Sequence, residues 1–170
     1  FQTFALPICF DFDSMLHRPF PYSTLSCQTV GNHMIRQGLM IKYLGLPPHS
    51  DVLEFGSGWG NLTLSLARMG HRVTAVEISS KLLDLIGRRS EKLDLDIKLV
   101  HNEMLTFESK GIYDAVVFFE AFHHCSRHLN MLERLHRFVK DDGVVLFGFE
   151  PITPDPDLWG DYPWGVRMDG

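Results

Sequence analysis

Three glycines at alternate positions, with a carboxylate just ahead of them, form the stretch of this sequence best suited to binding a ligand. The stretch contains Glu54, Gly56, Ser57, Gly58 and Gly60. Glycine lets the backbone turn sharply and approach a ligand closely, because no Cβ stands in the way. A helix expected to begin near residue 61 would add N–H groups that have no partner inside that helix. The stretch therefore predicts a site for a nucleotide-type ligand.

A second carboxylate lies where the next strand is expected to end. Glu77 closes an apolar run and is followed by Ile78. A carboxylate at this place can accept two hydrogen bonds from the neighbouring hydroxyls of a ribose. A solvated charge at the end of a strand is the alternative explanation.

Further polar residues follow the later apolar runs. They are Asn102 with Glu103 and Met104, the segment from Glu120 to His124, and Glu150. An imidazole at His123 could accept a proton from a hydroxyl group, or it could bond to a loop carbonyl in a purely structural role. We expect His124 to point away from the site, because neighbouring side chains diverge in most backbone conformations.

Alternating strands and helices must position these residues. Apolar patterning predicts strands over 51–55, 71–78, 96–100, 113–119 and 144–149, and helices over 29–44, 61–69, 80–93 and 126–139. Such alternation predicts an α/β fold with a doubly wound, parallel, Rossmann-like sheet. Ligands of such sheets bind beyond the carboxyl ends of the strands. All the polar residues above would then lie at one edge of the sheet.

The chain divides into three regions on composition. Residues 1–28 read as an irregular lead-in, residues 29–150 as the ligand-binding domain, and residues 151–170 as a tail rich in proline and tryptophan. Because the chain begins at Phe1 and stops at Gly170 within that tail, we expect it to be a piece of a longer protein.

The amino-acid composition limits the kinds of binding partner and the cellular compartment to be expected. The 170 residues are 45% hydrophobic and 22% charged, with a net charge of −5, which disfavours a nucleic-acid surface. No apolar run reaches the ~20 residues that span a bilayer, so no membrane partner is expected. Three cysteines without a pairing pattern are typical of a reducing, cytoplasmic setting.

The motifs together resemble those of the class I S-adenosylmethionine-dependent methyltransferases, over roughly residues 29–150. The resemblance rests on Glu-x-Gly-x-Gly-x-Gly, on the strand-end Glu77 and on the segment after the fourth strand. It implies S-adenosylmethionine as the cofactor and the strand order 3-2-1-4-5. It also implies cofactor contacts from Glu54, Gly56, Ser57, Gly58, Gly60, Glu77, Ile78, Glu103, Met104 and Glu120, with Glu103 near the adenine amino group.

The activity implied is methyl transfer to a small molecule, with a hydroxyl or saccharide acceptor and His123 as the catalytic base. The segment from Glu120 to His124 lacks the Asn/Asp-Pro-Pro-aromatic form of enzymes that methylate exocyclic amines of DNA bases, which argues against a base methyltransferase, as the negative net charge does. A metal site at His123, His124, Cys125 and His128 is not expected, because no established ligand pattern is present.

Three alternatives remain open. A truncated or non-catalytic methyltransferase fold could act as a binding module. An NAD-dependent oxidoreductase would share the sheet, but the G-x-G-x-x-G pattern would need glycine where Asn61 stands. The Gly-Trp-Gly around Trp59 is similar to the cyclopropane synthase branch, which alkylates lipids.

The resemblance also predicts an incomplete sheet. Family members usually add a sixth and a seventh strand, which we expect to be missing here. The fifth strand would then be a bare apolar edge, and such edges pair with other chains unless something covers them. A homodimer through this edge, or a tail folded over it, is expected.

Overall fold

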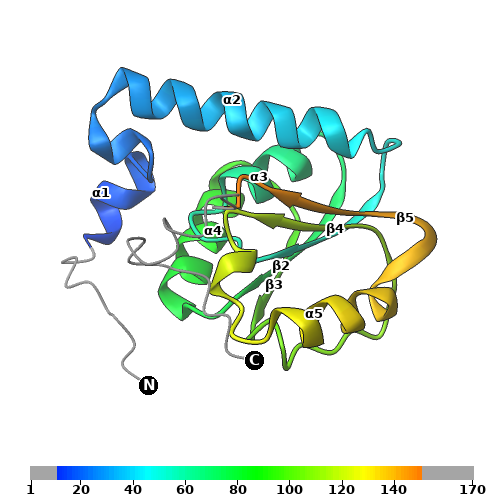
Figure 1. The fold of residues 1–170 in the computed structure, drawn as a ribbon. Coiled ribbons are helices and arrows are strands. Elements are labelled where there is room, and N and C mark those ends of the chain that lie inside the picture. Colours follow the sequence, from blue (N-terminus) through cyan, green and yellow to red (C-terminus); the bar gives the residue numbers. More distant parts are fainter. Residues whose placement is uncertain (1–10, 151–170) are drawn as a thin grey trace, which may run out of the picture.

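Five apolar segments pair as a parallel sheet in the computed structural model, which describes residues 11–150 (Figure 1). The strands are β1 (Asp51–Phe55), β2 (Arg72–Glu77), β3 (Ile97–His101), β4 (Tyr113–Phe119) and β5 (Val139–Gly148). Their order is β3-β2-β1-β4-β5, and every neighbouring pair is parallel. The predicted Rossmann-like fold and strand order are confirmed.

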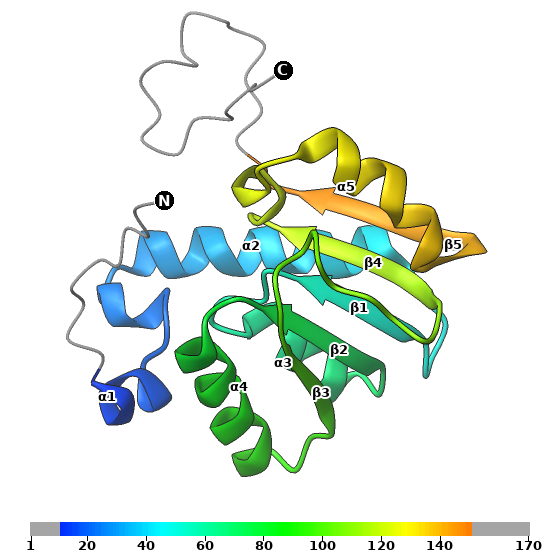
Figure 2. The same cartoon turned by 90° about the horizontal axis from the view of Figure 1, so that it is seen from below.

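Helices cover both faces of this sheet (Figure 2). The longer ones are α2 (Cys27–Leu44), α3 (Asn61–Arg68), α4 (Ser80–Lys92) and α5 (His128–Arg134). Two begin at serine caps: Ser26 accepts a hydrogen bond from the Thr29 N–H at 3.2 Å, and Ser79 accepts one from the Leu82 N–H at 3.4 Å.

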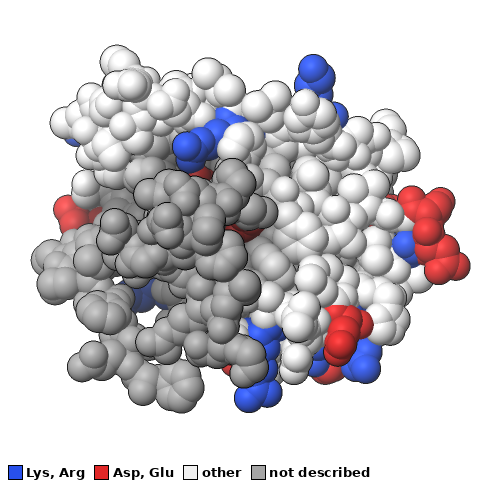
Figure 3. All heavy atoms as spheres, in the orientation of Figure 1, with Lys and Arg blue, Asp and Glu red and all other residues white. Residues whose placement is uncertain are grey.

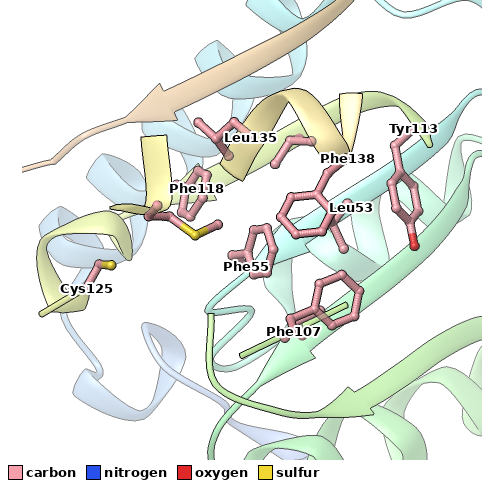
Figure 4. Close-up of a cluster of buried hydrophobic side chains, with 11 residues drawn as sticks. Leu53, Phe55, Phe107, Tyr113, Phe118, Cys125, Leu135 and Phe138 are labelled. Carbon is pink, nitrogen blue, oxygen red and sulfur yellow. The ribbon is translucent and has the colours of Figure 1, made fainter. Parts of the chain in front are cut away.

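Successive side chains of each strand point to opposite faces of the sheet, and they contribute to two separate hydrophobic cores. On one face, α2 and α3 pack on Val52, Val73 and Ala115. On the other, Leu53 and Phe55 meet the side chains that α5 and the following turn supply (Figure 4). Because parallel strands buried on both faces are apolar almost throughout, the polar groups gather at the strand ends.

Stacked aromatic rings fill the second core. The rings of Phe55 and Phe118 stack at 5.2 Å between centroids, and Phe118 stacks on Phe147 at 5.0 Å. These contacts link the central strands to β5. Cys125 lies at the end of this cluster, after β4 (Figure 4).

Two predicted segments differ from the structure. The lead-in over residues 1–28 is not irregular where it is described: it contains α1 (Phe12–His17), the short helix η1 (Tyr22–Thr24) and the start of α2. The Asp11 carboxylate caps α1 by accepting from the Ser14 N–H, and the Arg88 guanidinium lies over the Phe12 ring at 4.6 Å. Local capping and contact with α4 thus order a segment that has no hydrophobic period.

The predicted helix over residues 126–139 is also too long. It divides into α5 and the short helix η3 (Leu135–Arg137), and Val139 already belongs to β5. The expected turn at residues 141–143 lies inside that strand, where Tyr113 pairs with Val139 but Ala115 pairs with Val144. The extra residues bulge out of the ladder, which is why their polar sequence looks like a turn.

Strand β5 forms an edge of the five-stranded sheet. Val144 on this strand is 38% exposed. The tail expected to cover the edge lies outside the described residues, and the homodimer remains a prediction. None of the helices within residues 11–150 is long and apolar enough to cross a bilayer.

Candidate active site

The glycine turn after β1 has the sharp backbone that its sequence predicts. Gly56 has φ 67° and Gly60 has φ 73°, both in the left-handed region that favours glycine. The Gly56 N–H donates to the Val76 carbonyl at 2.8 Å, which fixes the turn against β2. A Cβ on Gly56 would lie 2.7 Å from the Ala121 Cβ. The turn is therefore in close contact with the segment that follows β4.

Replacing Gly56 with alanine should disrupt this contact. The new methyl group would push Ala121 away and would hold an unfavourable φ, each at a cost of roughly 1–2 kcal/mol. We expect a lower melting temperature and an affinity for S-adenosylhomocysteine at least tenfold weaker by calorimetry. Gly38→Ala, on α2 with open space around it, is the control: it should leave the affinity unchanged and should not lower the melting temperature, because alanine is favoured over glycine inside a helix. Wild-type affinity in Gly56→Ala would show that the close contact does not shape the site.

Glu77 joins the glycine turn to the start of α4. One carboxylate oxygen accepts from the Gly58 N–H at 2.9 Å, and the other accepts from the Ser79 N–H at 2.9 Å. The residue is buried, with 7% of its surface exposed, yet it lines a cavity. Because each carboxylate oxygen has two lone pairs, both can accept a further hydrogen bond from a ligand. This geometry suits a ribose diol.

Glu54 lies beneath the turn rather than in the cavity. Its carboxyl group accepts a hydrogen bond from the Thr63 hydroxyl at 2.6 Å, and both residues are buried. Burial raises the pKa of Glu54 to about 8, the Thr63 hydrogen bond opposes that rise, and the nearby Glu77 adds to it. Glu54 is therefore mostly protonated at neutral pH. The predicted cofactor contact from this residue remains a prediction.

A cavity of about 340 Å³ opens at the carboxyl ends of the strands. Seven residues predicted to bind the cofactor line it, namely Gly56, Gly58, Glu77, Ile78, Glu103, Met104 and Glu120. The other three, Glu54, Ser57 and Gly60, are buried and do not line it. Gly60 instead provides the space for Ile86 of α4, which its Cβ would approach to 2.6 Å.

The structure adds cavity residues that the sequence analysis did not single out, namely Val76, Leu82, Leu105 and Ser126. Ala121 and His124, from the segment noted after the fourth strand, and Cys125, considered there only as a metal ligand, also line the cavity. Asn102 also lines the cavity, and its side-chain oxygen Oδ1 accepts from the Glu103 N–H at 2.8 Å and the Thr106 hydroxyl at 2.7 Å. Asn102 could be predicted as a site residue because it follows the end of a strand. Nothing in the sequence indicated that Leu82 on α4 lies at the site.

Glu120 connects the cavity to α2. It lines the cavity, and its carboxylate forms an ion pair with the Arg36 guanidinium. Arg36 also lies over the Phe149 ring, with its guanidinium carbon 5.7 Å from the ring centroid. Sequence patterning could not find this pair, because the two residues meet only when α2 packs on the sheet and extends past the carboxyl ends of the strands (Figure 2).

The two histidines after β4 are oriented opposite to the prediction. His124 lines the cavity, whereas His123 does not. The Nδ1 atom of His123 lies 2.7 Å from a carboxylate oxygen of Glu150, and its side chain is only 12% exposed. Within the short helix η2 (Phe122–His124), the His123 ring is held by Glu150 and packs against the His124 ring, which lies on the cavity side. The cavity lining therefore favours His124, and His123 as the catalytic base stays a prediction.

The electrostatic environment of His124 suits proton acceptance. Partial burial and the neighbouring His123 lower the pKa of His124, while Glu150 and Glu77 oppose that change. The two imidazole rings lie 4.0 Å apart between centroids. His124 is therefore largely neutral at pH 7. Within residues 11–150, no three His, Cys, Asp or Glu side chains are grouped so as to hold a metal ion.

A parallel sheet of order 3-2-1-4-5 with a glycine turn, a strand-end carboxylate and a cavity beside them defines a class I, S-adenosylmethionine-binding fold. Residues 52–143 match the family described as "Methyltransferase domain". The chain belongs to this methyltransferase family, whose cofactor is S-adenosylmethionine. The suspected family and cofactor are confirmed.

Individual relatives differ in what they methylate. The chain is 41% identical over 71 residues to an rRNA adenine N-6-methyltransferase of Streptococcus sanguinis, covering 41% of this chain and 28% of that protein. It is 28% identical over 109 residues to a ubiquinone biosynthesis O-methyltransferase of Xanthomonas campestris pv. campestris, covering 63% of this chain and 46% of that one. The chain thus spans less than half the length of these relatives.

A solved structure supports the same fold. Coclaurine N-methyltransferase, bound to N-methylheliamine and S-adenosylhomocysteine, is similar to this chain with a TM-score of 0.64 and 25% identity. The similarity covers 67% of this chain and 34% of that enzyme.

Proposed function

We propose that this protein transfers a methyl group from S-adenosylmethionine to a small-molecule acceptor, with a hydroxyl or saccharide oxygen as the accepting atom. The observation that carries the proposal is Glu77, which lines the cavity while both its oxygens are anchored by backbone N–H groups of the glycine turn and of α4. A cavity of about 340 Å³ is within the range of small-molecule sites. The O-methyltransferase relative supports an oxygen acceptor.

The chain's residues fit the parts of the cofactor. Glu77 would bind the ribose hydroxyls, and the backbone at Gly56 and Gly58 would let the cofactor approach closely. Glu103 would accept from the adenine amino group, while Ile78 and Met104 would pack on the adenine ring. Glu120, at the boundary with Arg36, would face the reacting end of the cofactor.

The chemistry asks little of the protein beyond positioning. S-adenosylmethionine supplies an activated methyl group when it is bound. The cavity walls hold the acceptor oxygen in line with that group and exclude water, and such orientation can contribute ~7–11 kcal/mol. We propose His124, rather than the predicted His123, as the group that takes the acceptor's proton onto an imidazole nitrogen.

Calorimetric titration tests the cofactor assignment. S-adenosylhomocysteine should bind and NAD should not, because Glu77 and the glycine turn match an adenosyl ligand without a pyrophosphate. Glu77→Ala should weaken binding by ~1–3 kcal/mol, since it removes the acceptors for the ribose and leaves two backbone N–H groups unpaired. Glu91→Gln, an exposed carboxylate on α4, is the control for the loss of charge. Tight NAD binding with no response to S-adenosylhomocysteine would refute the proposal.

Methylation of RNA is a second candidate, favoured by the 41% identity to the rRNA methyltransferase. The net charge of −5 and the absence of an Asn/Asp-Pro-Pro-aromatic segment after β4 oppose it. Lys and Arg side chains are scattered on the described part of the face in Figure 3 and do not form a patch. Incubation with radiolabelled S-adenosylmethionine and either ribosomal RNA or a panel of hydroxylated metabolites distinguishes the two. A folded protein that binds cofactor but labels neither would indicate the binding-module alternative.

A further inference from the structure

Glu150 lies two residues after the end of β5 and reaches across to the turn that follows β4. One carboxylate oxygen accepts from the N–H groups of Ala121 and Phe122 at 2.9 and 2.8 Å. The other accepts from the His123 N–H at 3.0 Å and from the His123 imidazole at 2.7 Å. The Glu150 side chain is only 5% exposed. A single buried carboxylate therefore satisfies three successive backbone donors and one side chain.

The backbone on both sides of these contacts is strained. Glu120 has φ 51° and Phe149 has φ 57°, a left-handed conformation that is unfavourable for residues other than glycine. The Glu120 N–H donates to the Gly148 carbonyl at 2.9 Å, so β4 and β5 leave the sheet at the same level. Such conformations persist only where surrounding contacts hold them. Glu150 makes the contacts that hold this pair of turns.

The anchored turn forms one wall of the cavity. Ala121 and His124 line it, and Ala121 is also the residue that lies close to Gly56 of the glycine turn. Successive backbone N–H groups in a turn form a concavity that binds anions. Burial opposes ionisation of Glu150, but the hydrogen bonds from His123 and from the three backbone N–H groups prevail and lower its pKa. The carboxylate is therefore charged at neutral pH, as the anchor requires.

We propose that Glu150 is a positioning residue that fixes the turn at residues 121–124 against the glycine turn, so that His124 faces the cavity. The inference rests on the proposed function for the identity of the ligand, but not for the anchoring itself. Without the carboxylate, three partly buried N–H groups lose their acceptor and the strained turn relaxes. Both the cofactor site and the orientation of His124 then change.

Hydrogen exchange of the full chain tests the anchoring directly. In the wild type, the amides of Ala121, Phe122 and His123 should be protected. In Glu150→Gln, which keeps the shape but loses the charge and one acceptor oxygen, they should exchange at least tenfold faster. Glu150→Ala should show a larger increase and an affinity for S-adenosylhomocysteine at least tenfold weaker. If Glu150→Ala does not fold, Glu150→Gln decides the question.

Asp114→Asn provides a matched control. The Asp114 carboxylate also accepts from a backbone N–H, that of Asp51 at 2.7 Å, and it also forms an ion pair, with Lys140 at 2.6 Å. It lies at the opposite end of β4, so its loss should lower stability without changing exchange at residues 121–123 or ligand affinity. This control distinguishes a general loss of stability from a local displacement of the turn at residues 121–124.

An NMR titration of His124 supplies a readout that a loss of stability alone would not change. Glu150 raises the pKa of His124 against the opposing effects of burial and His123, with Glu77 acting in the same direction as Glu150. In the Glu150→Gln variant, His124 should therefore titrate at a lower pH than it does in the wild type. Wild-type exchange, wild-type affinity and an unchanged His124 titration in a folded Glu150 variant would overturn the inference. Failure of the wild type to bind S-adenosylhomocysteine would instead refute the proposed function, and the exchange data would still decide the anchoring.

Discussion

Replacing His124 with alanine should lower turnover by about 10²–10⁴-fold while leaving the affinity for S-adenosylmethionine nearly unchanged. His124 lines the cavity at the end of β4, and its lowered pKa keeps it neutral and able to take a proton at pH 7. A hydroxyl acceptor is a poor nucleophile until its proton is removed, so the loss should fall on the chemical step. Single-turnover rates on an acceptor from the metabolite screen would measure this effect.

The pH profile and the neighbouring histidine provide the controls. The wild-type rate should rise through one ionisation whose midpoint lies below the ordinary histidine value of ~6.5, because the pKa of His124 is lowered. His124→Ala should lose this step. His123→Ala should have a smaller effect, because His123 contacts Glu150 and does not line the cavity. A larger loss in His123→Ala than in His124→Ala would restore the base predicted from the sequence.

Glu54→Gln should change the pH dependence of stability by on the order of 4 kcal/mol between pH 5 and 8. The pKa of Glu54 is about 8 in the folded protein and near 4.5 in an unfolded chain. Between these values the folded state holds a proton that the unfolded state has released. The wild type therefore loses stability as pH rises through this window, by up to ~1.4 kcal/mol per pH unit. A neutral amide has no such dependence.

Urea unfolding at pH 5, 6.5 and 8 measures this difference. The two proteins should be closest in stability at pH 5, and Glu54→Gln should be increasingly more stable than the wild type towards pH 8. Glu91→Gln, at an exposed position on α4, serves as the control for removing a carboxylate. Parallel stability curves for wild type and Glu54→Gln would mean that Glu54 is not held protonated. The Thr63 hydrogen bond would then outweigh burial.

Patterns local in sequence determined most of the fold. Five apolar runs alternating with amphipathic segments predicted the five parallel strands. The alternating glycines at residues 56, 58 and 60 predicted the turn, because left-handed backbone at Gly56 and Gly60 requires that residue type. Glu77 could be placed beside that turn, because the carboxyl ends of neighbouring parallel strands meet at one edge. These features depend on short-range geometry that each residue type carries with it.

Contacts between segments that are distant in sequence determined the features that local patterns did not predict. The bulge in β5 places residues 141–143 in a strand because β4 pairs on both sides of them, which no local preference encodes. Arg36 meets Glu120 only because α2 packs on the sheet and extends past the carboxyl ends of the strands. The choice between His123 and His124 depended on Glu150, whose carboxylate binds one imidazole and fixes the turn that directs the other into the cavity. Side-chain direction in an irregular turn is set by its hydrogen-bond partners, and those partners are known only once the chain has folded.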